Sequence, residues 1–529
     1  MKSLAEPWSP LLFEMRAIRN ISWSLIAVVL MSQFNPQSTR ITEKFFAEYT
    51  LLPEVTPALK KEKGFTNHQE LTEYLQQLSS RFPDKLTLTS VGKSKNGLNI
   101  PLVLLKTNTQ APKIRVWLQG GLHGDEPAST ESMLYLLYEL LHNPANTPLF
   151  DSLEIALVPM ANIDGYLKQE RNNAENLDLN RDQTKLMAHE TPLLKRAFAA
   201  FDPHIALDFH EFRPYRRDFV KLSTFGVTSA YDLMFLYSGN LNVPESLRRF
   251  TDSHFLEPTR KSLSEAGLRH HDYFTTDEEL GSIHFNMGSN SARSSATNFA
   301  LQNRISTLFE VRGVGLGRTS FKRRIYTGYL VAIQYLRQAA LHPQAIRAAI
   351  VAANQTADSV TVRSKRSSYK HTLEFIDLDK VELLPLELEV HDAGKTLATL
   401  KRERPLGYLF TAEQKALVDK LKLYGYQVYE FPSDTSIAVE SYEVKTCKKS
   451  AQKYEQVFTQ TVSTVLKPNQ ILFKAGATFV SMQQPMNNLL PELLEPEAPN
   501  SVVYFGLMQA PVGAILPIYR IPNSKQKTP

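Results

Sequence analysis

Cysteine is nearly absent from this chain of 529 residues, in which Cys447 is the only one. A single cysteine excludes an intrachain disulfide, and it also excludes a metal centre built from several thiolates. This scarcity fits the cytosol or a bacterial periplasm and argues against a small secreted domain held together by disulfides. Cys447 lies in a lysine-rich segment, so we assign it no catalytic role.

The chain also has little excess charge and no long apolar run. Its 60 Lys and Arg residues are offset by 54 Asp and Glu residues, which leaves a net charge of +6. The basic residues form only short clusters, such as 363–370 and 445–449, whereas a nucleic-acid-binding protein concentrates them. The apolar stretch 25–31 is shorter than the roughly 20 residues that span a bilayer. We therefore expect neither a nucleic-acid partner nor a stable membrane span.

The N-terminus has the pattern of an export signal. Arg16 and Arg19 precede the apolar stretch, and Met15 offers an alternative start. No A-x-A-like cleavage site follows, and a buried N-terminal helix is the alternative interpretation. We predict a signal or leader segment over residues 1–34 and an exported protein, periplasmic in a bacterium. The protein would be cytoplasmic if this segment is not a signal.

Alternating helix and strand patterns predict an α/β catalytic domain over residues 65–360. We expect a mixed, mostly parallel sheet flanked by helices. An apolar stripe of Leu71, Tyr74, Leu75 and Leu78 predicts the first helix. The expected strands cover 86–91, 100–106, 114–118, 153–158, 205–209 and 305–310. Further helices cover 129–141 and 193–201, and a helical region runs over 326–357.

The rest of the chain divides into an arm and a second domain. Residues 35–64 are mixed and polar and predict an N-terminal arm. The basic, serine-containing stretch 363–369 predicts a linker. Residues 365–529 predict a β-rich C-terminal domain of unknown role, with strands near 381–390, 427–431, 470–473 and 502–505 and a helix over 412–423.

Two short segments offer metal ligands. His123 and Glu126 lie three positions apart in GGLHGDE, and His210 lies in DFHEF after an apolar strand. Two histidines and a carboxylate suit zinc and leave a fourth position for water, although cobalt or manganese would also fit. Taken singly, these residues would be a surface histidine, a first-turn carboxylate and a structural histidine. The glycines around His123 favour a tight turn beside an ion.

Further charged residues lie in the segments between and after these ligands. Glu310 ends the apolar strand ISTLFE, where a carboxylate is costly unless it is paired or functional. A salt bridge to Arg312 is the structural alternative. Asp178 lies in LDLNR, where it would either form a turn or bond a metal-bound histidine. Arg171 lies in QERNNAEN, and a guanidinium there suits carbonyl or carboxylate oxygens.

In order and wording, these segments resemble the M14 family of zinc carboxypeptidases. The resemblance covers about residues 65–340 and includes the opening FTNHQELTEYLQQL and the segment VPMANIDGY, where Ile163 replaces the family's proline. It implies one zinc ion held by His123, Glu126 and His210, Asp178 bonded to the first histidine, Glu310 as general base, Arg171 at the scissile carbonyl, and Asn180 and Arg181 on the substrate's α-carboxylate. We assign Tyr273 in HHDYFTTD as the mobile tyrosine that caps the substrate.

The resemblance implies a zinc-dependent metallopeptidase that removes C-terminal residues from peptides or from peptidoglycan stems. The alternative is an amide deacylase of N-acyl amino acids, because the D-x-H and DLNR wording also resembles the aspartoacylase and succinylglutamate desuccinylase branch. A binding protein that retains the site as a scaffold is the third hypothesis. The stretch before the catalytic domain is too short for the family's activation prodomain, so we expect the chain to be made active. Side-chain preference and oligomeric state stay open.

Overall fold

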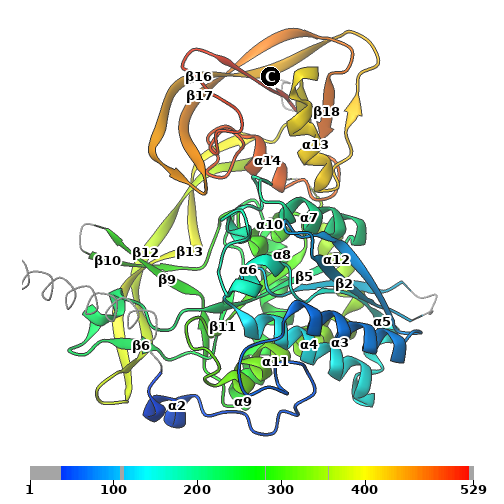
Figure 1. The fold of residues 1–529 in the computed structure, drawn as a ribbon. Helices are drawn as coiled ribbons and strands as arrows, with labels where there is room; N and C mark the ends of the chain where they lie inside the picture. Colours follow the sequence, from blue (N-terminus) through cyan, green and yellow to red (C-terminus); the bar gives the residue numbers. More distant parts are fainter. Residues whose placement is uncertain (1–36, 108–111, 280–281, 356, 524–529) are drawn as a thin grey trace, which may run out of the picture.

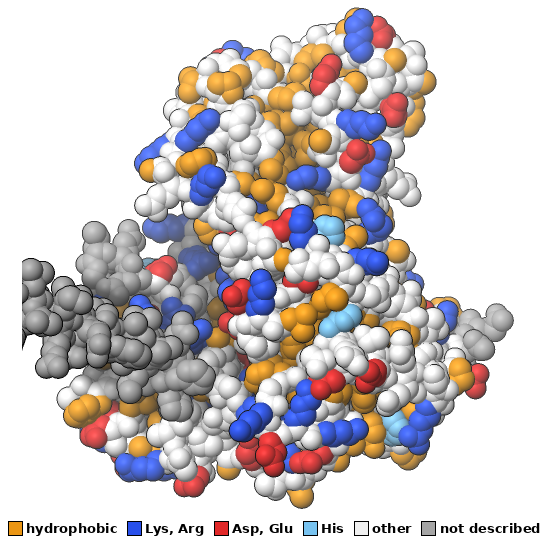
Figure 2. Space-filling view, viewed as in Figure 1, with side chains coloured by type: hydrophobic (Ala, Val, Ile, Leu, Met, Phe, Trp, Pro, Cys, Tyr) orange, Lys and Arg blue, Asp and Glu red, His pale blue; other side chains and the backbone are white. Residues whose placement is uncertain are grey.

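The computed structural model describes residues 37–107, 112–279, 282–355 and 357–523. The predicted signal segment, 1–34, lies outside them. Figure 1 shows a lower body of helices around a sheet and an upper part that holds the end of the chain. Figure 2 shows basic and acidic side chains interspersed over the face that it draws, which fits the small net charge. Within the described ranges, no helix has the length and apolar character needed to cross a membrane.

An eight-stranded mixed sheet forms the centre of the body. Its strand order is β1 (Leu86–Lys93), β2 (Asn99–Leu105), β4 (Leu153–Val158), β3 (Ile114–Gln119), β5 (Ile205–Phe212), β11 (Ile305–Arg312), β7 (Leu233–Leu236) and β8 (His270–Asp272). The central neighbours β4, β3, β5 and β11 run parallel, whereas β1, β2 and the pair of β11 with β7 are antiparallel. The predicted α/β fold class, with a mixed and mostly parallel sheet, is confirmed.

Helices pack on this sheet and bury its central strands. The main ones are α3 (His68–Arg81), α4 (Pro127–His142), α7 (Glu190–Phe201), α10 (Ser295–Leu301) and α11 (Phe321–Leu341), and shorter ones are α5 (Leu149–Ser152), α6 (Ile163–Lys168), α8 (Glu245–Thr251) and α9 (Glu257–Glu265). The stripe predicted from residue 71 onward is the buried face of α3, which begins with a capping box of Asn67 and Glu70. All residues of β5 are buried, as expected for a central strand with helices on both faces.

The N-terminal arm packs along the body. Its helix α2 (Thr39–Phe45) lies in a small apolar cluster with Ile376 and Val381. The following residues contact α4, where the buried Glu131 accepts hydrogen bonds from Thr66 Oγ1 at 2.6 Å and from the amide of Ala58 at 2.9 Å. These contacts tie the arm to the body by buried polar bonds as well as by apolar packing.

One prediction for the middle of the chain is confirmed and another is wrong. The helical region expected over 326–357 consists of two helices, α11, which ends at Leu341, and α12 (Pro343–Ala353), and the break between them falls at Pro343, which has no amide hydrogen to continue a helix. The stretch 363–369 is not a linker, since it lies within the long strand β12 (Ser359–Asp377). β12 pairs with β13 (Leu383–Glu403) in a five-stranded sheet, ordered β6 (Val227–Ser229), β12, β13, β10 (Ser282–Met287) and β9 (Phe274–Glu279).

The C-terminal part is a six-stranded sheet. Its order is β15 (Tyr429–Glu430), β18 (Thr478–Ser481), β14 (Gly407–Phe410), β19 (Ile515–Ile521), β16 (Thr435–Tyr454) and β17 (Val457–Phe473), and α13 (Lys415–Leu423) and α14 (Leu489–Leu494) accompany it. The predicted strand over 502–505 is wrong, because these residues form turns in which Ser501 Oγ accepts from the amide of Tyr504. The domain boundary near residue 365 stays a prediction.

A buried carboxyl group links the two parts. Glu492 on α14 accepts hydrogen bonds from Asn240 Nδ2 at 2.7 Å and Asn242 Nδ2 at 2.9 Å, both from the segment after β7. Burial raises the pKa of Glu492 to about 7, although the two amides oppose the rise. The protein therefore favours the neutral form of this carboxyl.

This burial predicts a pH-dependent effect of Glu492→Gln. Between an ordinary glutamate pKa of 4.5 and about 7, the folded protein keeps a proton that the unfolded chain releases. Stability is therefore lost as the pH rises through this range, and a neutral amide avoids the loss. We expect the melting temperature of the variant, relative to wild type, to be higher at about pH 8 than at about pH 5. Equal differences at both pH values would contradict the assignment.

Candidate active site

Three predicted metal ligands converge at the carboxyl ends of the central strands. His123 follows β3, Glu126 precedes α4 and His210 lies in β5, and all three side chains are buried. His123 Nδ1 lies 2.7 Å from Glu126 Oε1, and His210 Nδ1 lies 2.9 Å from Glu126 Oε2. The two Nδ1 atoms are 3.0 Å apart. Among the described residues this is the group of His and carboxylate side chains able to share a metal ion.

The second nitrogen of each histidine faces a carboxylate. His123 Nε2 lies 3.0 Å from Asp178 Oδ1, and His210 Nε2 lies 3.0 Å from Asp208 Oδ2. With a proton on each Nε2, both Nδ1 lone pairs point at Glu126 and at each other. Such an arrangement is repulsive without a cation, so the donor set fits a divalent metal and, by ligand type, zinc.

Electrostatics at the ligands agree with a cation site. Burial opposes ionisation of Glu126, but His123 and His210 lower its pKa. Burial also opposes protonation of His210, yet Asp208 and Glu126 raise its pKa. The surroundings of the two imidazoles are thus strongly negative, which favours a bound positive charge.

Asp208 is a site residue that the sequence analysis did not assign. Side chains two positions apart in a strand point to the same face of the sheet. The D-x-H pattern on a predicted strand could therefore have indicated that Asp208 lies beside His210. Asp178, which was assigned, lies where the resemblance placed it and bonds His123 from a separate loop.

Glycines allow the loop after β3 to fold around the ligands. Gly121 has a φ of +62°, a conformation that costs other residues energy. At Gly124 a Cβ atom would lie 2.1 Å from the carbonyl carbon of Gly165, so the loop packs directly against the backbone of α6. This contact explains why glycine stands next to His123.

Glu310 faces the same site from the neighbouring strand. β11 pairs with β5 in parallel register, and Glu310 lies opposite His210. Burial raises the pKa of Glu310 to about 7, with His210 opposing the rise and Glu126 adding to it. The alternative salt bridge to Arg312 does not form, because Arg312 donates to Gln37 Oε1 at 2.8 Å and to the carbonyl of Ser229.

Arg171 is held at the edge of the metal ligands. Its Nη2 and Nε lie 2.8 and 2.9 Å from Asp178 Oδ2, and its Nη1 lies 3.2 Å from His123 Nδ1. Asp178 therefore orients both a histidine ligand and the guanidinium. Burial opposes the charge of Arg171, but Asp178 and Glu126 raise its pKa further.

Asn180 and Arg181 lie next along the same loop. The amide of Asn180 donates to Asp178 Oδ1 at 2.7 Å, and its Oδ1 accepts from the amide of Ser295 at 2.8 Å. Arg181 Nη1 donates to the carbonyl of Asn180 at 3.0 Å. Both side chains line a cavity of about 400 Å³ that also contains His123, Arg171 and Glu310.

Comparisons with known proteins agree with this geometry. Residues 71–202 match the sequence profile described as zinc carboxypeptidase. Carboxypeptidase 2 of Trichophyton equinum is 30% identical over 442 residues, which covers 81% of this chain and 81% of that protein. The chain belongs to the M14 zinc carboxypeptidase family. It is a metallocarboxypeptidase, a hydrolase of peptide bonds, and its substrates are peptides.

This M14 carboxypeptidase is also similar to a second fungal carboxypeptidase and to a solved carboxypeptidase structure. Carboxypeptidase 2 of Trichophyton rubrum is 29% identical over 446 residues and covers 81% of each chain. The crystal structure of carboxypeptidase A from Helicoverpa armigera has 18% identity and a TM-score of 0.41, and covers 54% of this chain and 78% of that one. The predicted peptidase activity is confirmed. The bacterial origin stays a prediction, and both of these carboxypeptidase 2 relatives are fungal.

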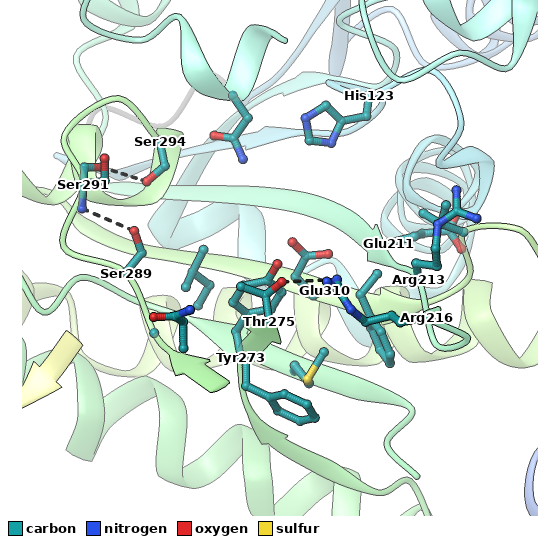
Figure 3. Close-up of a pocket in the computed structure, with 18 of the residues that line it drawn as sticks. His123, Glu211, Arg213, Arg216, Tyr273, Thr275, Ser289, Ser291, Ser294 and Glu310 are labelled. Carbon is teal, nitrogen blue, oxygen red and sulfur yellow. Dashed lines mark hydrogen bonds between the residues drawn. The ribbon is translucent and has the colours of Figure 1, made fainter. Parts of the chain in front are cut away.

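Tyr273 also lies in the cavity of this M14 carboxypeptidase. It follows β8 and packs against Leu236, Ala296 and Leu308. Figure 3 shows Tyr273 beside Glu310, with His123 on the opposite side of the cavity. Burial raises the pKa of Tyr273 to about 12, and the carboxylate of Glu310 adds to the rise.

A buried ion pair between Glu211 and Arg324 holds the segment that carries Glu126. Glu211 Oε1 accepts from Arg324 Nε at 2.8 Å, while Oε2 accepts from the amide of Ala128 at 2.9 Å in the first turn of α4. The amide of Glu211 in turn donates to Glu126 Oε2 at 3.1 Å. Glu211 therefore has a structural role, because its carboxylate bonds Arg324 and the first turn of α4.

This pair predicts a large stability effect at Arg324. Arg324→Met would leave the buried Glu211 carboxylate without its cation, at a cost of about 3–5 kcal/mol. We expect a clearly lower melting temperature in this variant. The double variant Glu211→Gln with Arg324→Met should be more stable than the single one, because no charge is left unpaired. A single variant as stable as wild type would contradict the pairing.

Proposed function

We propose that this M14 carboxypeptidase releases single residues from the C-terminus of peptides with one zinc ion held by His123, Glu126 and His210. The convergence of these three ligands beside Glu310 and Arg171 is the observation that carries the proposal. When bound, zinc supplies a Lewis acid that polarises a carbonyl and lowers the pKa of water.

Glu310 is suited to move the proton in this reaction. Its carboxylate is half-buried at the cavity and lies opposite His210, within the same pocket as the ligands. A carboxylate in this position accepts the proton of the attacking water and passes it to the leaving amine. The pairing of Arg312 with other groups leaves Glu310 without a competing cation from its own strand.

Arg171, Asn180 and Arg181 are suited to hold the substrate. Asp178 fixes the guanidinium of Arg171, which supports a role at the oxygen of the scissile carbonyl. Asn180 and Arg181 lie further along the same loop and offer an amide and a forked guanidinium to the terminal carboxylate. Recognition of that carboxylate restricts cleavage to the last residue.

The finer assignments belong to the same proposal. Tyr273 is suited to cap the substrate because it lines the cavity beside Glu310. A cavity of about 400 Å³ suits a short peptide terminus, and a peptidoglycan stem also ends in a carboxylate. Export of the protein, to a periplasm if the source is bacterial, rests on the pattern of residues 1–34.

The metal assignment predicts the zinc content of single variants. We expect about one zinc ion per wild-type chain and a strong loss of zinc in His210→Asn, because each ligand contributes to binding. His204→Asn is a matched control, since His204 Nδ1 accepts from the amide of Arg115 at the other end of β5. Elemental analysis of the purified proteins measures the outcome. Retention of zinc by His210→Asn would contradict the site.

The general-base assignment predicts the kinetics of Glu310→Gln. We expect kcat to fall about 10²–10⁴-fold because the proton acceptor is lost, while the zinc content is retained. Mass spectrometry of a mixed peptide library measures the release of C-terminal residues. The exposed Glu265 on α9 offers a matched control, Glu265→Gln, with unchanged activity.

Substrate class is tested with the same proteins. Loss of single C-terminal residues by wild type supports the proposal. Turnover of N-acyl amino acids without trimming of peptides would instead favour the deacylase.

A further inference from the structure

Arginine side chains line the catalytic cavity on both sides of Glu310, with Arg213 and Arg216 on one side. Arg181, Arg293 and Arg366 also line the cavity. A second cavity of about 280 Å³ shares Ser291, Arg293 and Arg366 with the first and is also lined by Arg363. The two cavities therefore adjoin, and basic residues lie at the junction.

This basic junction lies next to the residues proposed to hold the terminal carboxylate. Ser295 donates its amide to Asn180 Oδ1, and the carbonyl of Arg293 accepts from the amide of Gln183 at 3.3 Å. Figure 3 shows Ser289, Ser291 and Ser294 on one side of Glu310, and Arg213 and Arg216 on the other. The proposed contact of the terminal carboxylate with Asn180 would place the side chain of the leaving residue near the segment 289–295, because the amide of Ser295 bonds Asn180.

Arg293 carries a charge that no neighbouring carboxylate neutralises. Within the described part of the chain, no ion pair within 4.0 Å involves its guanidinium. Its guanidinium carbon lies 4.7 Å from the ring centre of Tyr454 instead. A cation held over an aromatic ring in a partly buried position keeps its N–H donors available for an anion.

Arg366 faces the same junction and is also incompletely neutralised. Its Nη1 donates to the neutral amide oxygen of Asn286 at 2.8 Å. The carboxylates of Asp277 and Asp392 also act on the Arg366 guanidinium electrostatically. The uncharged hydroxyls of Ser289, Ser291 and Ser294 also line the first cavity, and the carboxyl of Glu492 lines the second.

The C-terminal sheet positions Arg293. Tyr454 ends β16, at the tip of the hairpin with β17. The same tip contacts the loop of Asp178, where Glu455 Oε2 accepts from the amide of Asp178 at 3.2 Å and Gln456 Nε2 donates to the carbonyl of Glu175 at 2.6 Å. The hairpin tip therefore touches both the loop that carries Asn180 and the arginine beside it.

We propose that Arg293 and Arg366 form a subsite for a carboxylate on the side chain of the released residue, with Tyr454 as a positioning residue for Arg293. The proposal rests on the proposed carboxypeptidase function. It adds a substrate preference of the enzyme for peptides that end in glutamate or aspartate. A side-chain carboxylate pairs with these guanidinium groups, whereas a basic side chain would meet like charges. An apolar side chain would leave the guanidinium groups without a partner.

Peptides that differ only in the last residue, Glu, Gln, Leu or Lys, test the subsite. We expect kcat/KM of the wild type to be about 10–100-fold higher for Glu than for the isosteric Gln, as for one charged hydrogen-bonded contact. Arg293→Gln and Arg366→Gln should each reduce this Glu-to-Gln ratio toward one. Arg249→Gln, at an exposed arginine paired with Glu245 on α8, should leave both rates unchanged.

Two variants of Tyr454 test its positioning role. Tyr454→Phe keeps the aromatic ring and should keep the Glu-to-Gln ratio, whereas Tyr454→Leu should lower it. A merely structural role would reduce the rates for both peptides and leave the ratio unchanged, so that result would overturn the role of Tyr454.

The outcomes separate this proposal from the carboxypeptidase function. Release of Leu or Gln at a rate equal to Glu would overturn the subsite and leave the function intact. If no peptide is trimmed, the function fails, and calorimetry of free glutamate against free glutamine then decides the subsite. Tighter binding of glutamate that Arg293→Gln abolishes would support it, and equal binding of the two amino acids would overturn it.

Discussion

The parallel pairing of β5 with β3 on one side and β11 on the other is the constraint on which the site depends. Because parallel strands end at the same edge, His123, His210 and Glu310 meet there although they come from distant parts of the chain. Register matters as much as proximity. A shift of one residue between β5 and β11 would turn Glu310 to the other face of the sheet and away from His210.

The charges in this site fall into two groups with different surroundings. Around the candidate metal ligands several buried charges have a partner: Asp178 with His123 and Arg171, Asp208 with His210, and Glu211 with Arg324. Such pairing is required because an isolated buried charge is strongly unfavourable. At the junction of the two cavities, by contrast, Arg293 lies over an aromatic ring. The first group makes the ligand geometry rigid, and the second leaves donors for a substrate.

The C-terminal sheet is part of the active-site architecture. Its hairpin tip contacts the loop of Asp178, and Glu492 binds the segment after β7. These contacts are polar and buried or partly buried, so they specify orientation more than they add stability. The loop that orients a histidine and a guanidinium, and that we propose binds the terminal carboxylate, gains support from a second layer of structure.

The sequence by itself determined the fold class and pointed to the residues of the candidate metal site. Apolar strand runs, the glycines around His123 and the position of Glu310 at a strand end are local signals, and their order along the chain resembles one family. Only the tertiary structure decided that 363–369 forms a strand, that Arg312 binds Gln37 rather than Glu310, and that Tyr454 lies against Arg293. These contacts join residues remote in sequence, and no local pattern encodes a partner that folding alone brings near.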